Sequence, residues 1–398
     1  MLRNSLGVIT KRRVVLAASL DSTVRRFHSD PAIKDADRDL KESGLPDSVL
    51  PPTTLDLFRD GKWPQSLSKE SITADNDFNR WAVVPASFAV QVSIGSVYAW
   101  SMWNEPLTKQ LGVVASSSQD WGLAEVVPIF SCTAAALGAT TFFLGPWAER
   151  SGPAITGGTA AVCYSTACIL SGVGALYHQL PLIMLGYGLF GGVGWGLGYI
   201  SPVSTLMRWF PDRRGMATGL ALSAFGGGAV LAAPMIQSAC NYFAKAPEYM
   251  GKLADVDLII QNGIQYVEMG GQMKEVVVAT AADLVNFPGL SEGVYLVGTG
   301  STGAGEAFIG LGVAYGAMMS LGALGARVPA PGWAPPGYVP LTDEEAQKKM
   351  ISSHNVDHHQ ALYTPQFYLL WVAVAGNAVA GMAVISNAKM MMGDVFGV

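Results

Sequence analysis

Long apolar stretches separated by short polar connections dominate the chain from residue 81 onward. A membrane-spanning helix needs about 20 mostly apolar residues to cross a hydrocarbon core roughly 30 Å thick. Seven stretches reach that length and predict seven transmembrane helices, at 81–103, 121–145, 154–177, 182–205, 215–240, 305–327 and 367–388. Their only charged residues are Glu125, Glu306 and Arg327, all close to predicted ends, whereas a surface helix of a soluble protein carries a polar face.

Composition supports a membrane protein and excludes several functional classes. Only 14% of the residues are charged, against about 25% in soluble domains. The net charge of -5 and the absence of a basic cluster on any folded stretch argue against a nucleic-acid partner. The four cysteines lie inside apolar stretches, without metal-ligand spacing, and no catalytic motif stands out. We therefore expect a lipid bilayer as partner, no metal or other cofactor, and no enzymatic activity.

Lysine and arginine in the short loops predict the orientation. Arg150 lies between the second and third spans, and Arg208, Arg213 and Arg214 lie between the fourth and fifth. Even-numbered spans therefore end on the positive side, where the N-terminus is also expected. The long loop at 241–303 falls on the opposite side.

Glycines recur at helical spacing in the fourth and fifth spans. One set is Gly188, Gly192 and Gly196, a second is Gly194 and Gly198, and the fifth span carries Gly215, Gly219 and Gly226 to Gly228. Small residues on one face let membrane helices approach closely. The pattern predicts tight packing, with sliding between helices as an additional hypothesis.

Two further motifs have weaker support. Gly298-x-Gly300-x-x-Gly303 resembles a dinucleotide-binding turn, but the helix after it is a predicted span and lacks the expected acidic residue near position 320. The glycines are better interpreted as returning a flexible loop to the membrane. His354, His358 and His359 match no established ligand spacing and are expected in a solvated linker.

A charged turn follows the second span and carries a family resemblance. The stretch 145–153 reads GPWAERSGP, with Gly145, Glu149, Arg150 and Gly152 in the order G-x-x-x-[DE]-R-x-G. It resembles the loop between the second and third helices of the major facilitator superfamily. In that family this loop holds one half of the transporter against the other, and the resemblance implies a conformational role for these residues. A charged turn arising by chance is the alternative.

Three other stretches resemble the oxalate/formate antiporter and monocarboxylate transporter branch of that superfamily. They are 208–219, with Arg213 and Arg214, 327–333, and the opening of the seventh span at 366–371. The resemblance covers residues 80–398. It implies an all-α transmembrane fold, with the N-terminal six-helix bundle of a major facilitator protein plus a seventh helix.

This resemblance also predicts a domain organisation. Residues 1–80 are expected to be a disordered N-terminal region, 81–327 the six-helix bundle with its long loop at 241–303, 328–366 a central linker, and 367–398 the seventh helix. Since the superfamily has twelve spans in two halves, we expect the chain to be truncated after the seventh helix, or else to act as a half-transporter in a dimer. The sequence does not indicate an oligomeric state.

The resemblance implies transport of a small organic anion, a monocarboxylate or dicarboxylate, by alternating access. No lysine or arginine lies deep in the predicted spans, so neutral side chains are the candidates for substrate binding: Gln91, Tyr98, Trp100, Tyr199 and Asn377. Gln91 and Tyr98 are seven residues apart and share a helix face. Tryptophan and tyrosine near span ends are also common interfacial anchors. A membrane protein that is inactive in transport, or an assembly partner, is the alternative function.

The first 29 residues are rich in arginine and serine and contain Asp21 as their only acidic residue. This composition is typical of an organelle transit peptide. It favours a mitochondrial inner membrane, although a basic cytosolic tail would have a similar composition.

Overall fold

The computed structural model describes residues 71–75, 77–285, 287–338 and 358–396, all within the unit Trp63–Val398. The predicted transit peptide at 1–29, most of the region 1–80, His354 and much of the 328–366 linker lie outside the described residues. The helices are α4 (Val83–Gly95), α5 (Ser101–Thr108), α6 (Leu123–Ser151), α7 (Pro153–Leu176), α8 (Leu180–Ile183), α9 (Gly192–Trp209), α10 (Arg214–Phe243), α11 (Ala304–Gly325), α13 (His358–Ala361) and α14 (Pro365–Phe396).

Seven helical segments in the described part of the chain are long and apolar enough to cross a membrane, as predicted. They are Arg80–Ala99, Leu123–Ser151, Pro153–Leu176, Leu180–Trp209, Pro211–Phe243, Ala304–Gly325 and Pro365–Gly393. The chain is therefore a multi-pass, mostly helical membrane protein. The fourth segment joins α8 to α9 through a π-helical stretch, Met184–Gly191.

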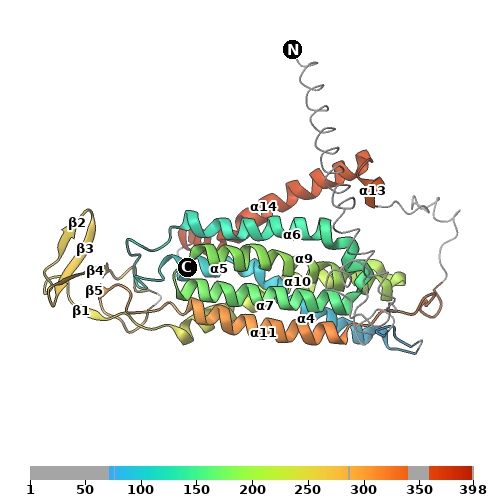
Figure 1. The fold of residues 1–398 in the computed structure, drawn as a ribbon, viewed down its shortest axis with the longest axis horizontal. Helices are drawn as coiled ribbons and strands as arrows, with labels where there is room; N and C mark the ends of the chain where they lie inside the picture. The colour runs from blue at the N-terminus through green and yellow to red at the C-terminus, as the bar shows by residue number, and fades with distance from the viewer. Residues whose placement is uncertain (1–70, 76, 286, 339–357, 397–398) are drawn as a thin grey trace, which may run out of the picture. The chain divides into compact units, whose positions relative to one another are not determined.

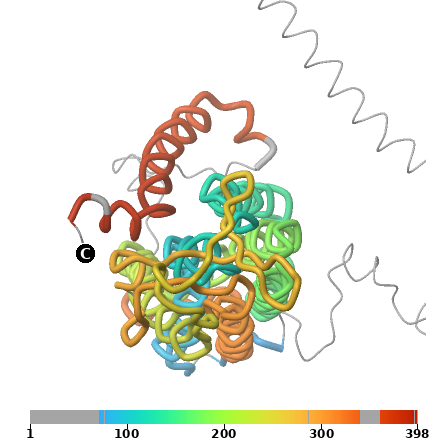
Figure 2. The backbone as a smooth tube through the Cα atoms, turned by 90° about the vertical axis from the view of Figure 1, so that its left-hand side faces the viewer, coloured from blue at the N-terminus to red at the C-terminus, as the bar shows by residue number. Residues whose placement is uncertain are grey.

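The first six spans pack side by side, as Figures 1 and 2 show. Helix α7 packs most extensively against α11 and also against α9, which in turn contacts α6. Helix α4 packs against α10, α11 and α9. The seventh span, α14, is different, since only 6% of its apolar stretch is buried. Its main contact is with α5.

The glycine pattern of the fourth span is explained by two separate helix contacts. A Cβ added to Gly192 or Gly196 would meet α6 at Ala136 or Thr140. One added to Gly194 would lie 2.7 Å from the backbone nitrogen of Tyr164 on α7. Gly192 and Gly196 thus pack against one helix and Gly194 against another, which is the close approach that small residues allow in lipid.

Two local predictions are wrong in detail. Gly145, Glu149 and Arg150 do not form a turn, because α6 continues to Ser151; the turn is at Gly152, which has a φ of 84°. The apolar span predicted at 367–388 is shorter than the helix, which runs to Phe396 within the region 367–398 assigned to the seventh helix, and so contains Lys389. In both cases the helix extends beyond the apolar core, where charged residues are exposed to water or paired.

The 241–303 loop contains an antiparallel sheet that the sequence analysis did not predict. Its strands are β1 (Tyr249–Gly251), β2 (Ile259–Gln261), β3 (Ile264–Met269), β4 (Gln272–Ala279) and β5 (Gly293–Leu296), in the order β1-β5-β4-β3-β2. Figure 1 shows the sheet beyond one end of the helices. Val114 packs among Val277, Ala279 and Tyr295, which attaches the sheet to the first connection between spans.

The Gly298-x-Gly300-x-x-Gly303 motif returns the chain from β5 to α11. Gly298 and Gly303 have φ values of 79° and 73°, and Gly303 is the N-cap residue of α11. Positive φ values of this kind favour glycine. These glycines therefore make turns between the sheet and a span, as expected. The division of the whole chain into domains stays a prediction.

Candidate functional site

The charged stretches 145–153 and 208–219, which follow the second and fourth spans, lie together at one end of the bundle. Arg208 at the end of α9 pairs with Glu149 at the end of α6, with 3.1 Å between the guanidinium and carboxylate groups. A cavity of about 170 Å³ lies beside this pair, lined by residues that include Gly145, Gly152 and Ser201. The fold thus brings the 145–153 and 208–219 stretches into contact.

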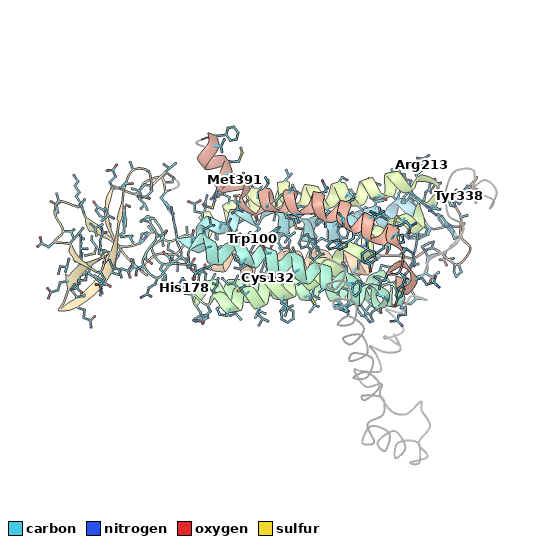
Figure 3. The ribbon with its side chains drawn as sticks, turned by 90° about the horizontal axis from the view of Figure 1, so that it is seen from above. Trp100, Cys132, His178, Arg213, Tyr338 and Met391 are labelled. Carbon is cyan, nitrogen blue, oxygen red and sulfur yellow. The ribbon has the colours of Figure 1, made fainter. Side chains whose placement is uncertain are left out.

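The remaining charged residues of these motifs have other roles. Arg150 donates from Nε to the backbone oxygen of Pro146, 3.2 Å away. Arg213 is largely exposed, and Figure 3 shows it near one end of the helices, with His178 near the other. Arg214 begins α10 and is also exposed. The predicted conformational residues therefore lie at one end of the bundle, and Glu149 is the one that links two spans.

Tyr98 and Tyr199 are gathered around Phe225. The ring centroids of Tyr98 and Phe225 are 4.8 Å apart, and those of Tyr199 and Phe225 are 5.4 Å apart. Trp195 completes the cluster, 5.8 Å from Tyr98. Both tyrosines are half-buried. Residues from the first, fourth and fifth spans therefore form one aromatic face with two hydroxyl groups.

Gln91 and Trp100 lie deeper, inside the bundle. Gln91 on α4 is fully buried, and neither amide atom has a hydrogen-bond partner among the described residues. Trp100 is also fully buried; its ring packs 4.7 Å from Tyr187, and within the described chain its Nε1 has no acceptor. Buried polar atoms normally have partners. These two side chains are therefore candidates for contact with a polar ligand.

Asn377 is not brought together with the other four. It lies on α14 with an exposed side chain. In the described part of the chain, none of five well-formed cavities is lined by the five predicted substrate residues. Their role in binding stays a prediction, which has geometric support for Tyr98 and Tyr199 as a pair and for Gln91 as an unsatisfied group.

A buried hydroxyl pair escaped the sequence analysis. Ser96 Oγ and Tyr164 Oη are 2.8 Å apart in the core, and Tyr315 lies 5.9 Å from Tyr164 between ring centroids. Ser96 also donates to the backbone oxygen of Ser93 at 2.6 Å. The residues come from the first, third and sixth spans, so only their polarity within apolar stretches could have indicated them.

Charged residues also connect α14 to the bundle, at the end that carries the sheet. Lys389 Nζ lies 2.8 Å from Glu105 Oε2, and Lys109 Nζ lies 3.9 Å from Glu105 Oε1. One turn before Lys389, the backbone oxygen of Ser386 accepts a hydrogen bond of 2.9 Å from Asn104. Sequence gives no local signal for this cluster, because its residues on α5 and α14 are more than 280 positions apart.

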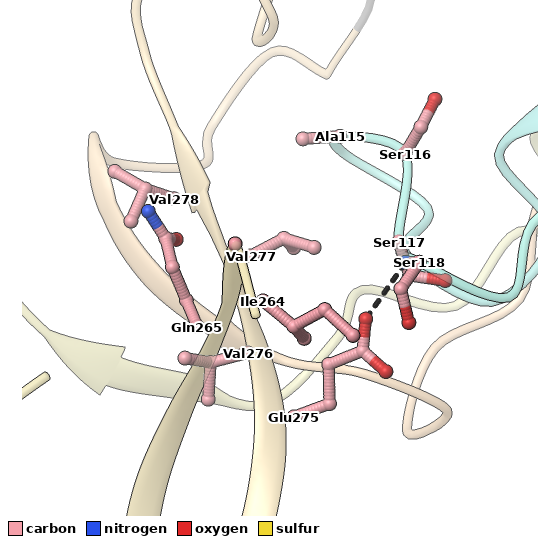
Figure 4. Close-up of a pocket in the computed structure, with 11 residues that line it drawn as sticks. Ala115, Ser116, Ser117, Ser118, Ile264, Gln265, Glu275, Val276, Val277 and Val278 are labelled. Carbon is pink, nitrogen blue, oxygen red and sulfur yellow. Dashed lines mark hydrogen bonds between the residues drawn. The ribbon is translucent and has the colours of Figure 1, made fainter. Parts of the chain in front are cut away.

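A cavity beside the sheet is a separate feature. A cavity of about 360 Å³ is lined by the loop 115–118 and by strands β3 and β4 (Figure 4). Glu275 accepts a hydrogen bond of 2.7 Å from the backbone nitrogen of Ser118 across it. The lining holds few charged groups, and it lies outside the helices. No group of three or more His, Cys, Asp or Glu side chains in the described chain is placed to hold a metal ion.

Comparison with known proteins supports a relation to transporters. The chain is 25% identical over 151 residues to the uncharacterized MFS-type transporter YhjX of Escherichia coli, which covers 38% of the chain and 35% of that protein. It is 26% identical over 207 residues to the oxalate:formate antiporter of Oxalobacter formigenes, covering 50% and 46%. It is 39% identical over 69 residues to monocarboxylate transporter 11 of Mus musculus, covering 17% and 15%.

These matches are partial, and they span less than half the length of the relatives concerned. No protein-family model matches the chain. These three relatives are nevertheless named as transporters, and the described chain has seven helices of membrane length. The chain is therefore a relative of transporters of the major facilitator type.

Proposed function

We propose that this protein moves a small organic anion, a monocarboxylate or dicarboxylate, across a membrane by alternating access. The observation that carries the proposal is the similarity to the oxalate:formate antiporter over half of the chain. The shorter similarity to monocarboxylate transporter 11 supports the same class of substrate.

The aromatic face around Phe225 supports a substrate site there. Tyr98 and Tyr199 remain half-buried, so their hydroxyl groups are accessible to a ligand while their rings pack against Phe225. Phenol hydroxyl groups donate hydrogen bonds to carboxylate oxygens. In a medium of low dielectric such bonds are stronger than in water. Gln91 would add two unsatisfied polar atoms about two turns away from Tyr98 on the same span.

The pair of Glu149 and Arg208 supports a moving contact between spans. It joins the ends of α6 and α9, and the Glu149 side chain is 72% exposed, so the pair breaks at little cost in water. A contact of this kind suits a carrier that alternates between two packings. In this proposal, the other predicted conformational residues at this end of the bundle take part in the same rearrangement. They are Gly145, Arg150, Gly152, Arg213 and Arg214.

The test is uptake of radiolabelled oxalate, formate and lactate into proteoliposomes that contain the complete chain. Uptake above that of empty liposomes, saturable and inhibited by unlabelled substrate, is expected. Tyr98→Phe and Tyr199→Phe are expected to raise KM, while Phe142→Leu, a change at an exposed position on α6, leaves it unchanged. Absence of uptake for every anion would support the alternative, a membrane protein without transport activity.

We also propose import into the mitochondrial inner membrane, carried by the composition of residues 1–29. These residues lie outside the described part of the chain. A fluorescent protein fused to residues 1–80 is expected to enter mitochondria, and diffuse cytosolic fluorescence would contradict this localisation.

A further inference from the structure

Glu105 lies between two lysines that come from different spans. One carboxylate oxygen faces Lys389 of α14 at 2.8 Å, and the other faces Lys109 of the first connection at 3.9 Å. The three side chains are 24–31% exposed, so water reaches the cluster without screening it fully. The two ammonium groups and one carboxylate carry a net charge of +1.

A small cavity adjoins these three charges. It measures about 50 Å³ and is lined by Glu105, Lys109 and Lys389 together with Thr302 and Asn241. A single water needs about 10–15 Å³ of such space. The cavity therefore has room for a carboxylate group next to Lys389.

We propose that Lys389 is a binding site for the carboxylate of a transported anion, and that Glu105 occupies this site as an internal competitor when the anion is absent. The inference rests on the proposed transport of a carboxylate. An incoming carboxylate has the same charge and the same two acceptor oxygens as the side chain of Glu105. It therefore replaces Glu105 at Lys389 without leaving either charge unpaired, because Glu105 retains Lys109.

The exchange has a mechanical consequence for α14. This helix is little buried, and its polar links to the bundle at this end include Glu105 to Lys389 and Asn104 to Ser386. Anion binding at Lys389 removes the first link and loosens the second, one helical turn away. Arrival of substrate is thereby coupled to the separation of α14 from α5.

The competition makes two substitutions act in opposite directions. The probes are sodium formate and sodium oxalate at constant ionic strength, and binding to the purified full chain in detergent is measured by titration calorimetry. Glu105→Gln is expected to bind formate about fivefold more tightly, since a partly exposed ion pair no longer competes. Lys389→Gln is expected to bind at least about tenfold more weakly, because the charge-assisted hydrogen bonds are lost. Lys274→Gln, a change at an exposed lysine on β4, serves as control.

A second measurement keeps the proposal testable if a charge variant folds poorly. Cysteines introduced at Asn104 and Ser386 report the distance between α5 and α14 with Glu105 and Lys389 intact. Formate is expected to slow formation of this disulfide severalfold relative to chloride, and each single-cysteine chain controls for pairing with native cysteines.

Any one of three results would overturn the inference. The first is unchanged or weaker formate binding in Glu105→Gln, and the second is wild-type affinity in Lys389→Gln. The third is a rate of disulfide formation that does not respond to formate. The proposed function fails separately. If the wild-type chain binds formate with this pattern but transports nothing in proteoliposomes, the site stands and transport does not. If it transports without the pattern, the Lys389 site is wrong.

Discussion

Arg80 holds Asp212 through two parallel hydrogen bonds, of 2.7 Å from Nη1 and 3.2 Å from Nη2. The same guanidinium lies over the ring of Phe210, 4.7 Å from its centroid. This contact joins the start of the first span to the turn between the fourth and fifth spans. The neighbouring Arg213 approaches Asp212 only to 3.7 Å and is 62% exposed.

Arg80→Lys is expected to destabilise the protein by about 1 kcal/mol, although the charge is kept. A lysine makes neither the paired hydrogen bonds nor the stacking on Phe210. The measurement is the thermal unfolding midpoint in detergent, with Arg213→Lys as the matched control, expected to change stability by less than about 0.5 kcal/mol. Equal effects of the two substitutions would show that the geometry at Arg80 contributes nothing.

Gly228→Ala is expected to destabilise the bundle by about 1–3 kcal/mol, the usual range for overpacking. A Cβ at this position would clash with the backbone oxygen of Val92 and lie 2.8 Å from Cα of Gly95 on the facing helix. Gly226→Ala, two residues away and in open space, is the control, and alanine should stabilise the helix there by up to about 1 kcal/mol. Thermal unfolding is measured for both variants, and the midpoint is expected to fall for Gly228→Ala and to rise for Gly226→Ala.

Gln91→Met is expected to raise stability and lower transport together. The substitution removes two buried polar atoms without partners in the described chain, which relieves a cost of about 1–3 kcal/mol. If Gln91 contacts the substrate, uptake falls at the same time. Thr133→Val is the control, because its hydroxyl donates to Ile129 and Tyr187 and its loss should destabilise. Higher stability with unchanged uptake would remove Gln91 from the substrate site.

The stability of the segment between β4 and β5 is expected to depend on pH through Asp283. Burial raises the pKa of this carboxyl, but hydrogen bonds from the Thr280 hydroxyl (2.7 Å) and backbone nitrogen (3.0 Å) outweigh that effect and lower the pKa below its usual value. A lowered native pKa contributes stability above the unfolded-state pKa of about 3.9, and this stability is lost as pH falls through the native pKa.

Hydrogen exchange at residues 280–284 is therefore expected to lose protection, after correction for intrinsic rates, as the pH falls below about 4. Asp283→Asn should show weak protection throughout and little dependence on pH. A pH response in Asp283→Asn equal to that of the wild type would assign the effect to another group.

Sequence alone determined the seven spans and the class of protein. A 20-residue apolar run has few alternatives to a membrane helix, because every backbone polar group must be bonded within the helix when water is absent. The spacing of Gly192, Gly194 and Gly196 likewise predicted close helix contacts, and the structure confirms them. The charged stretches around Glu149 and Arg208 were identified in sequence, though not as partners.

Only the tertiary structure decided which of these residues meet. Glu149 and Arg208 are 59 positions apart, and Glu105 and Lys389 are 284 apart, so no local pattern relates them. The sheet in the 241–303 loop was equally hidden, because its short strands are defined by pairing with one another. Periodicity records which face of a helix is apolar, whereas pairing of charges depends on where helices end relative to their neighbours. For that reason the spans were predictable, and the ion pairs that link them were not.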